Sequence, residues 1–104
     1  MSTVTGRVAR GAALLDEKRP GWWRDIDLAR LDLRYGCTCI VGQVEHLEDE
    51  EDYTDALAAL GLEHEWTEGD YGFDATSVYE FDEQLGDLAA AWRELITLRR
   101  ESAP

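Results

Sequence analysis

Apolar side chains recur at the three- and four-residue spacing of a helix face in three segments of the chain. Residues 3–18 form the first segment. Residues 84–100 form the clearest one, with two arginines in its last turn, where the helix dipole favours cations. Residues 50–60 form the third, with acidic side chains in its first turn. Gly61 then stands where a left-handed residue ends a helix, and Leu62 can fold back onto the last turn. The pattern predicts helices over these three ranges.

Two features of the first helix carry further information. Gly11 lies on its apolar face, and a glycine inside a helix costs about 1 kcal/mol relative to alanine, so we expect another part of the chain to pack closely there. Pro20 ends the helix, because the residue before a proline avoids the helical region. Trp22 and Trp23 follow, and adjacent side chains cannot share one face. We therefore expect Trp22 to cover one end of the core.

The segments between these helices follow no single period. Residues 25–34 mix helical and alternating spacings, with Asp27 as the N-cap of a short turn over residues 28–31. A further helix is predicted to begin at Thr38, although its β-branched content leaves a strand as the alternative. Residues 63–83 have the composition of an irregular loop. One face of the helix beginning at Thr38 would carry Cys37, Ile40, Val41, Val44 and Leu47.

The predicted fold is all-α: four to five short helices in a single domain over residues 1–104, with a long ordered acidic loop. An α+β domain with one or two short strands is the alternative. A chain of 104 residues can bury a core without disulfides or metals, which become necessary mainly below about 40 residues. No apolar run approaches the roughly 18 residues that span a bilayer, and no signal peptide is visible. With only two cysteines, one residue apart, we expect a cytoplasmic protein that does not bind membranes.

Charge is distributed unevenly along the chain, whose formal net charge is −13. Residues 1–44 hold 7 basic and 5 acidic side chains, and residues 88–104 hold 3 basic and 2 acidic ones. Residues 45–87 hold 16 acidic side chains and no lysine or arginine. This excess argues against direct binding of nucleic acid, which needs a basic face. The acids of the middle segment must face water, the basic ends of the chain or a partner.

The acidic segment is also rich in aromatic side chains, which are preferred anchors at protein interfaces. The sequence thus predicts a non-enzymatic protein that binds a protein partner through charge and aromatic contact area. A narrower alternative is a DNA mimic that inhibits a basic nucleic-acid-binding protein, because dense carboxylates imitate a phosphate backbone. The predicted partner-binding residues are Glu48, Asp49, Glu50, Glu51, Asp52, Tyr53, Asp55, Trp66 and Tyr71.

Four side chains could bind zinc, which takes four such ligands in a tetrahedron: Cys37, Cys39, His46 and His64. Their separations, of one residue, then 6, then 17, do not match the usual zinc hairpin. A metal-binding structural module therefore stands only as an alternative. No nucleophile lies in a recognised catalytic context, and no carboxylate is singled out as an acid or base. We expect neither an enzyme nor a bound cofactor.

Several short motifs, in order along the chain, resemble a family of small uncharacterised proteins of actinobacteria and their phages. The resemblance implies a source in such a bacterium, phage or prophage, and it brings no catalytic motif. It also favours the anti-restriction or anti-CRISPR type of DNA mimic. The motifs are GAALLD at residues 11–16, RPGW at 19–22, IDL at 26–28, LDL at 31–33, CIVGQ at 39–43, ALGL at 59–62, YGF at 71–73 and AWR at 91–93.

A homodimer is a further alternative. Two acidic segments in contact would repel each other, so a symmetric dimer must keep them apart. We expect any such contact to involve residues 1–35 or the last helix.

Overall fold

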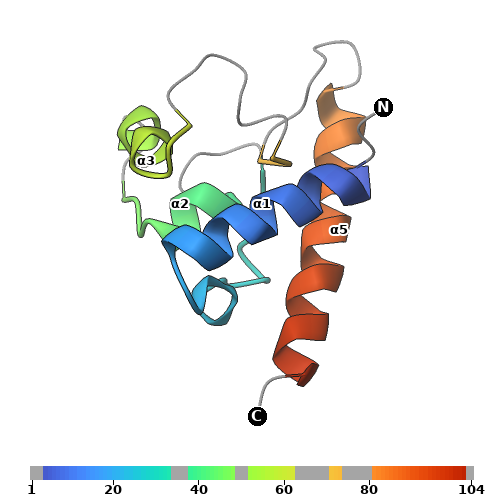
Figure 1. The fold of residues 1–104 in the computed structure, drawn as a ribbon. Coiled ribbons are helices and arrows are strands. Elements are labelled where there is room, and N and C mark those ends of the chain that lie inside the picture. Colours follow the sequence, from blue (N-terminus) through green and yellow to red (C-terminus); the bar gives the residue numbers. More distant parts are fainter. Residues whose placement is uncertain (1–3, 34–37, 49–51, 63–70, 74–80, 103–104) are drawn as a thin grey trace.

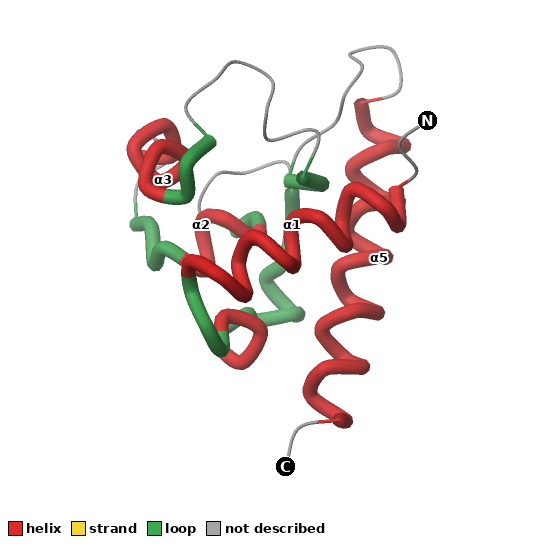
Figure 2. Tube along the Cα trace, viewed as in Figure 1, coloured by secondary structure: helices red, strands yellow, loops and turns green. Residues whose placement is uncertain are grey.

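The computed structural model describes residues 4–33, 38–48, 52–62, 71–73 and 81–102 (Figure 1). Every regular element in this part of the chain is helical, which confirms the all-α prediction (Figure 2). Neither the strand considered for residues 38–47 nor the short strands of an α+β domain occur there. The elements are α1 (Val4–Lys18), the 3-10 helix η1 (Trp22–Arg24), α2 (Ile40–Val44), α3 (Tyr53–Ala59) and α5 (Phe81–Ser102).

The observed boundaries depart from the predicted ones where local hydrogen bonds decide them. Helix α2 begins at Ile40 rather than Thr38, because extended Cys39 is its N-cap and accepts a hydrogen bond from the Gly42 amide at 3.3 Å. Asp27 accepts from the Ala29 amide at 3.0 Å, and the residues after it form a hydrogen-bonded turn, as the sequence predicts. Residues 81–83, predicted as loop, form the first turn of α5. Most of the predicted acidic loop lies outside the described residues.

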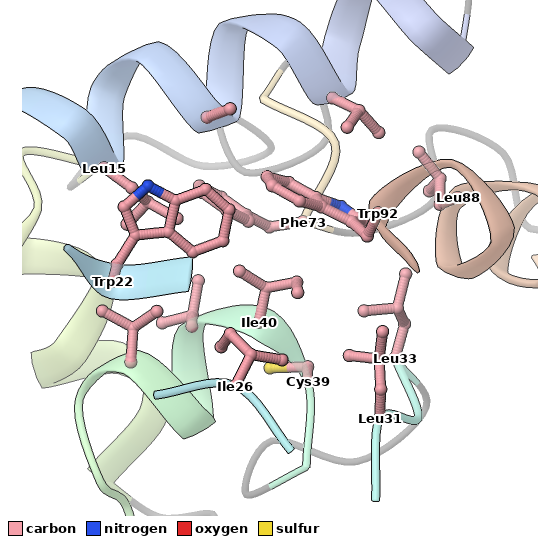
Figure 3. Close-up of a cluster of buried hydrophobic side chains, with 14 of the residues drawn as sticks. Leu15, Trp22, Ile26, Leu31, Leu33, Cys39, Ile40, Phe73, Leu88 and Trp92 are labelled. Carbon is pink, nitrogen blue, oxygen red and sulfur yellow. The ribbon is translucent and has the colours of Figure 1, made fainter. Parts of the chain in front are cut away.

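Three aromatic side chains form the centre of the core (Figure 3). The ring of Trp92, on α5, stacks on Phe73 at 5.6 Å between centroids and meets Trp22 edge-on, also at 5.6 Å. The Trp92 indole N–H donates to the Gly72 carbonyl at 2.7 Å, so its polar atom is satisfied although the side chain is fully buried. Trp22 is buried as predicted, and Trp23 is only half-buried beneath the Arg24 guanidinium.

The predicted close packing at Gly11 is confirmed. A Cβ atom there would lie far inside the van der Waals distance of the Tyr71 carbonyl oxygen, and 3.0 Å from two ring carbons of Trp92. A Cβ atom on Gly72, which has φ of 75°, would lie 3.0 Å from the backbone N and Cα of Val8. Glycine on both sides thus lets residues 71–73 lie directly on α1.

Arginines of α5 hold the segment that follows η1. Arg93 donates to the Leu31 carbonyl at 3.1 Å, while Arg100 donates to the carbonyls of Trp23, at 3.2 Å, and Ile26. This segment has little regular structure of its own, so side chains supply partners for its carbonyl groups.

The buried amide of Gln43 fixes the same segment from the other side. Its oxygen accepts from the Asp27 amide at 2.6 Å, and its nitrogen donates to the carbonyls of Asp27, at 3.2 Å, and Thr38, at 2.9 Å. Thr38 in turn hydrogen-bonds Asp32 through its backbone and its hydroxyl group. One side chain of α2 therefore joins two stretches of loop.

Helices α2 and α3 end in the same capping motif. In α3 the amides of Gly61 and Leu62 donate to the carbonyls of Ala58 and Leu57, and Gly61 has φ of 81°, as the sequence predicts. The equivalent left-handed residue after α2 is His46, with φ of 56°. A residue with a Cβ is strained in this conformation.

We expect His46→Gly to raise the free energy of unfolding by about 0.5–1 kcal/mol, because glycine adopts the left-handed conformation without strain. Gly61→Ala, at the equivalent position after α3, should lower it by about 1 kcal/mol. Urea unfolding of the two variants measures both effects. Destabilisation by His46→Gly would show that the imidazole makes a contact that outweighs the strain.

Candidate functional site

The described part of the predicted partner-binding surface lies around the start of α3. Glu48 and Asp52 are exposed just before the helix, Asp55 is exposed in its first turn, and Tyr53 is half-buried between them. Asp52 is the N-cap residue, although its side chain makes no capping hydrogen bond, and its carboxylate is left to solvent. The described residues of this stretch, 48 and 52–55, thus hold three exposed carboxylates and one aromatic ring.

The structure separates Tyr71 from this surface. Its backbone lies on α1 beside Gly11, whereas α3 lies apart from α1, at the left edge in Figure 1. Its half-buried ring packs against the core. The other predicted residues, Asp49, Glu50, Glu51 and Trp66, lie outside the described residues.

Arginine and carboxylate side chains are used differently in the fold. Several arginines of the described residues are engaged within the chain, by ion pairs, by hydrogen bonds to carbonyl groups or by a ring contact; they include Arg19, Arg24, Arg93, Arg99 and Arg100. Most exposed carboxylates of the described helices make no ion pair with any described residue. They include Glu48, Asp52, Asp55, Glu83, Asp87, Glu94 and Glu101. These exposed carboxylates are therefore available to water or to a partner.

Asp16 is a carboxylate with internal partners. It binds the Arg99 guanidinium through both oxygens, at 2.6 and 2.9 Å, and accepts from the Trp22 indole at 3.0 Å, so it joins α1, η1 and α5. The hydrogen bond from Arg99 lowers the pKa of Asp16 below its ordinary value; burial opposes this effect, and the Trp22 hydrogen bond adds to it.

This arrangement predicts a pH-dependent contribution to stability. The pKa of Asp16 is lower in the folded than in the unfolded chain, so its stabilisation is complete above the unfolded value of about 3.9 and is lost as the pH falls through the folded value. Since the side chain is 43% exposed, we expect Asp16→Asn to cost at most about 1 kcal/mol at neutral pH and less in acid. Urea unfolding of this variant and of a Glu17→Gln control, at about pH 7 and about pH 3, measures the difference. If Asp16→Asn lowered the free energy of unfolding equally at both pH values, the predicted pH dependence would be wrong.

The two described members of the proposed metal set lie at opposite ends of α2. The Cys39 sulfur is buried and caps the helix, while His46 is exposed beyond its C-terminus. The described residues contain no group of three or more His, Cys, Asp or Glu side chains that could bind one ion. Cys37 and His64 lie outside the described part of the chain.

A groove between α1 and α5 was not predicted as a binding site. Its volume is about 550 Å³ and its lining is largely apolar, with Thr5, Val8 and Ala9 on α1 and Ala91, Leu95 and Leu98 on α5. Leu98 is 55% exposed, the highest exposure among the large apolar side chains of the described residues. The signal was present in the sequence, because Ala91, Leu95 and Leu98 form a second apolar stripe beside the buried face of the last helix.

Comparison with protein families, curated proteins and solved structures finds no match to this chain. No helix in the described ranges has the length and apolar character needed to cross a membrane. The described residues form an all-α fold with exposed carboxylates and an apolar groove between α1 and α5.

Proposed function

We propose that this chain is a small acidic interaction protein of phage or prophage origin, without catalytic activity, that binds a basic protein partner in the cytoplasm. The proposal is supported by a difference between the positively and the negatively charged side chains of the described residues. Arg19, Arg24 and the arginines of α5 make contacts within the chain, while the carboxylates near α3 and along α5 face solvent. Such a surface accelerates association with a basic partner and selects against acidic ones.

The DNA-mimic alternative needs a higher density of charge than α5 provides. Glu83, Asp87, Glu94 and Glu101 occupy a helix length of about 27 Å, at about 1.5 Å per residue. This is one carboxylate per about 7 Å, against one phosphate charge per about 1.7 Å in duplex DNA. Mimicry would therefore depend on the acids of residues 49–51 and 63–80, outside the described part. We favour the broader proposal of a basic protein partner.

The proposal is tested by capturing partners from an actinobacterial lysate on the tagged protein and eluting them with a salt gradient. A basic protein released at moderate salt supports it, because salt screens exposed charges. If the released protein also binds DNA, competition by a short duplex tests whether both occupy one site. Retention of a non-basic partner at high salt would contradict the proposal.

The matched control is the same chain with the six acids from Glu48 to Asp55 changed to their amides. This variant keeps side-chain size and loses charge. We expect it to lose most of the captured basic partner. Capture of equal amounts by both proteins would show that these acids do not recognise the partner.

A further inference from the structure

The groove between α1 and α5 has walls of different character. In Figure 1, α1 crosses in front of α5. The groove is lined by residues from the N-terminal half of α1 and the C-terminal half of α5. The wall on α1 carries the exposed small side chains Thr5 and Ala9 beside the buried Val8, which allows a helix backbone to approach closely. The wall on α5 carries Leu95 and Leu98, which can interdigitate with apolar side chains of an occupant.

An acidic ridge runs along α5 beside this apolar wall. Glu83, Asp87, Glu94 and Glu101 follow one another at spacings of four, seven and seven residues, which places them on one side of the helix. Ala91, Leu95 and Leu98 lie on the adjacent side, facing the groove. All four carboxylates are exposed and form no ion pair with a described residue, and Glu94 itself lines the groove. Arg99 also lines it, but its charge is balanced by the ion pair with Asp16.

We propose that this groove binds a basic amphipathic helix of a partner protein. The apolar stripe of that helix seats against Leu95 and Leu98, and its lysines or arginines face the acidic ridge on α5. Ala91 to Ser102 spans about 16 Å, at about 1.5 Å per residue, which matches about three helical turns. The inference rests on the proposed function, because it takes the partner to be a basic protein, and it adds the form and place of the contact.

A second copy of this chain fits the groove less well. In an antiparallel pairing of two α5 helices through Leu95 and Leu98, the same ridge of each copy would flank the interface, carboxylate against carboxylate. The net charge of −13 on each chain opposes the association further. A basic helix is repelled neither by the acidic ridge nor by the net charge of the chain.

The test uses two synthetic peptides of equal composition and charge, each of about 18 residues of leucine and lysine. In the first, leucines recur at helical spacing to form a stripe; in the second, their order is scrambled. We expect the striped peptide to bind at least about tenfold more tightly, because only it places its apolar side chains together in the groove. Backbone amide shifts measured by NMR should change at Ala9, Ala91 and Leu98.

Two variants of the chain locate the contact. Leu98→Ser should weaken binding of the striped peptide about tenfold. Because Leu98 is 55% exposed, we expect the variant to stay folded, and circular dichroism checks this. Glu94→Gln should weaken it about threefold, whereas Glu48→Gln, which removes the same charge near α3, should have a smaller effect.

Equal binding of both peptides, with no effect of Leu98→Ser, would overturn the groove inference and leave the acidic interaction function standing. A dimer in sedimentation experiments that Leu98→Ser disperses would also overturn it, in favour of a second copy. If the chain binds the striped peptide but captures no basic partner that salt releases, the proposed function is contradicted. The groove would then remain a helix-binding site.

Discussion

Trp92→Ala is expected to lower the free energy of unfolding by about 3–5 kcal/mol, the largest loss among the substitutions considered. Trp92 is fully buried, stacks on Phe73, meets Trp22 edge-on and donates its indole N–H to Gly72. Removal of the ring leaves a cavity between three segments of chain and a buried carbonyl without its donor. Urea unfolding followed by circular dichroism measures the loss.

Two further variants separate packing from hydrogen bonding. Trp92→Phe keeps most of the aromatic contact but leaves the Gly72 carbonyl unpaired, and we expect a cost of about 1–3 kcal/mol. Trp23→Ala, at a half-buried tryptophan, removes a surface contact with Arg24 and should cost about 1 kcal/mol. Similar losses for Trp92→Ala and Trp23→Ala would show that Trp92 is not the centre of the core.

Gly11→Ala is expected to lower the free energy of unfolding by about 1–3 kcal/mol, even though alanine is the better helix former. The new methyl group would collide with the Tyr71 carbonyl oxygen, which is backbone and cannot simply rotate away, and would press on the Trp92 ring. Residues 71–73 would have to move off α1. We therefore also expect the fluorescence of the buried tryptophans to change.

Gly86→Ala is the matched control for this substitution. Gly86 lies inside α5, and a Cβ there would meet no atom within 4 Å, so the full benefit of helix propensity should be realised. We expect Gly86→Ala to raise the free energy of unfolding by about 0.5–1 kcal/mol. A lower free energy of unfolding for Gly11→Ala and a higher one for Gly86→Ala would support the close contact between α1 and residues 71–73. An equal increase for both variants would refute it.

The sequence predicts the helices well because their signals are local. The spacing of Leu85, Leu88, Trp92 and Ile96 defines the buried face of α5, and Gly61 marks the end of α3. Non-local contacts could not be derived in this way. The hydrogen bonds from the buried amide of Gln43 to Asp27 and Thr38 depend on a loop whose path follows no periodic pattern.

The candidate site was predicted only in part for the same reason. Charge counting along the chain indicates the acids near α3, and these are exposed in the structure where it describes them. It does not reveal that Arg93 and Arg100 are engaged with loop carbonyls, since those partners are brought together only by folding. Tyr71 was grouped with the acidic surface by its neighbours in sequence, but its backbone is fixed against Gly11.

The exposed carboxylates are proposed to recognise a basic partner. The most direct measurement is the dissociation constant of the captured partner between about 50 and 200 mM salt, for the natural chain and for the amide variant of the six acids from Glu48 to Asp55. A variant with Glu17→Gln and Asp25→Asn serves as the control for charge loss elsewhere. We predict affinity that falls steeply with salt for the natural chain and the control, and weaker binding with a shallower dependence for the amide variant. Equal affinity and equal salt dependence for all three proteins would contradict the claim.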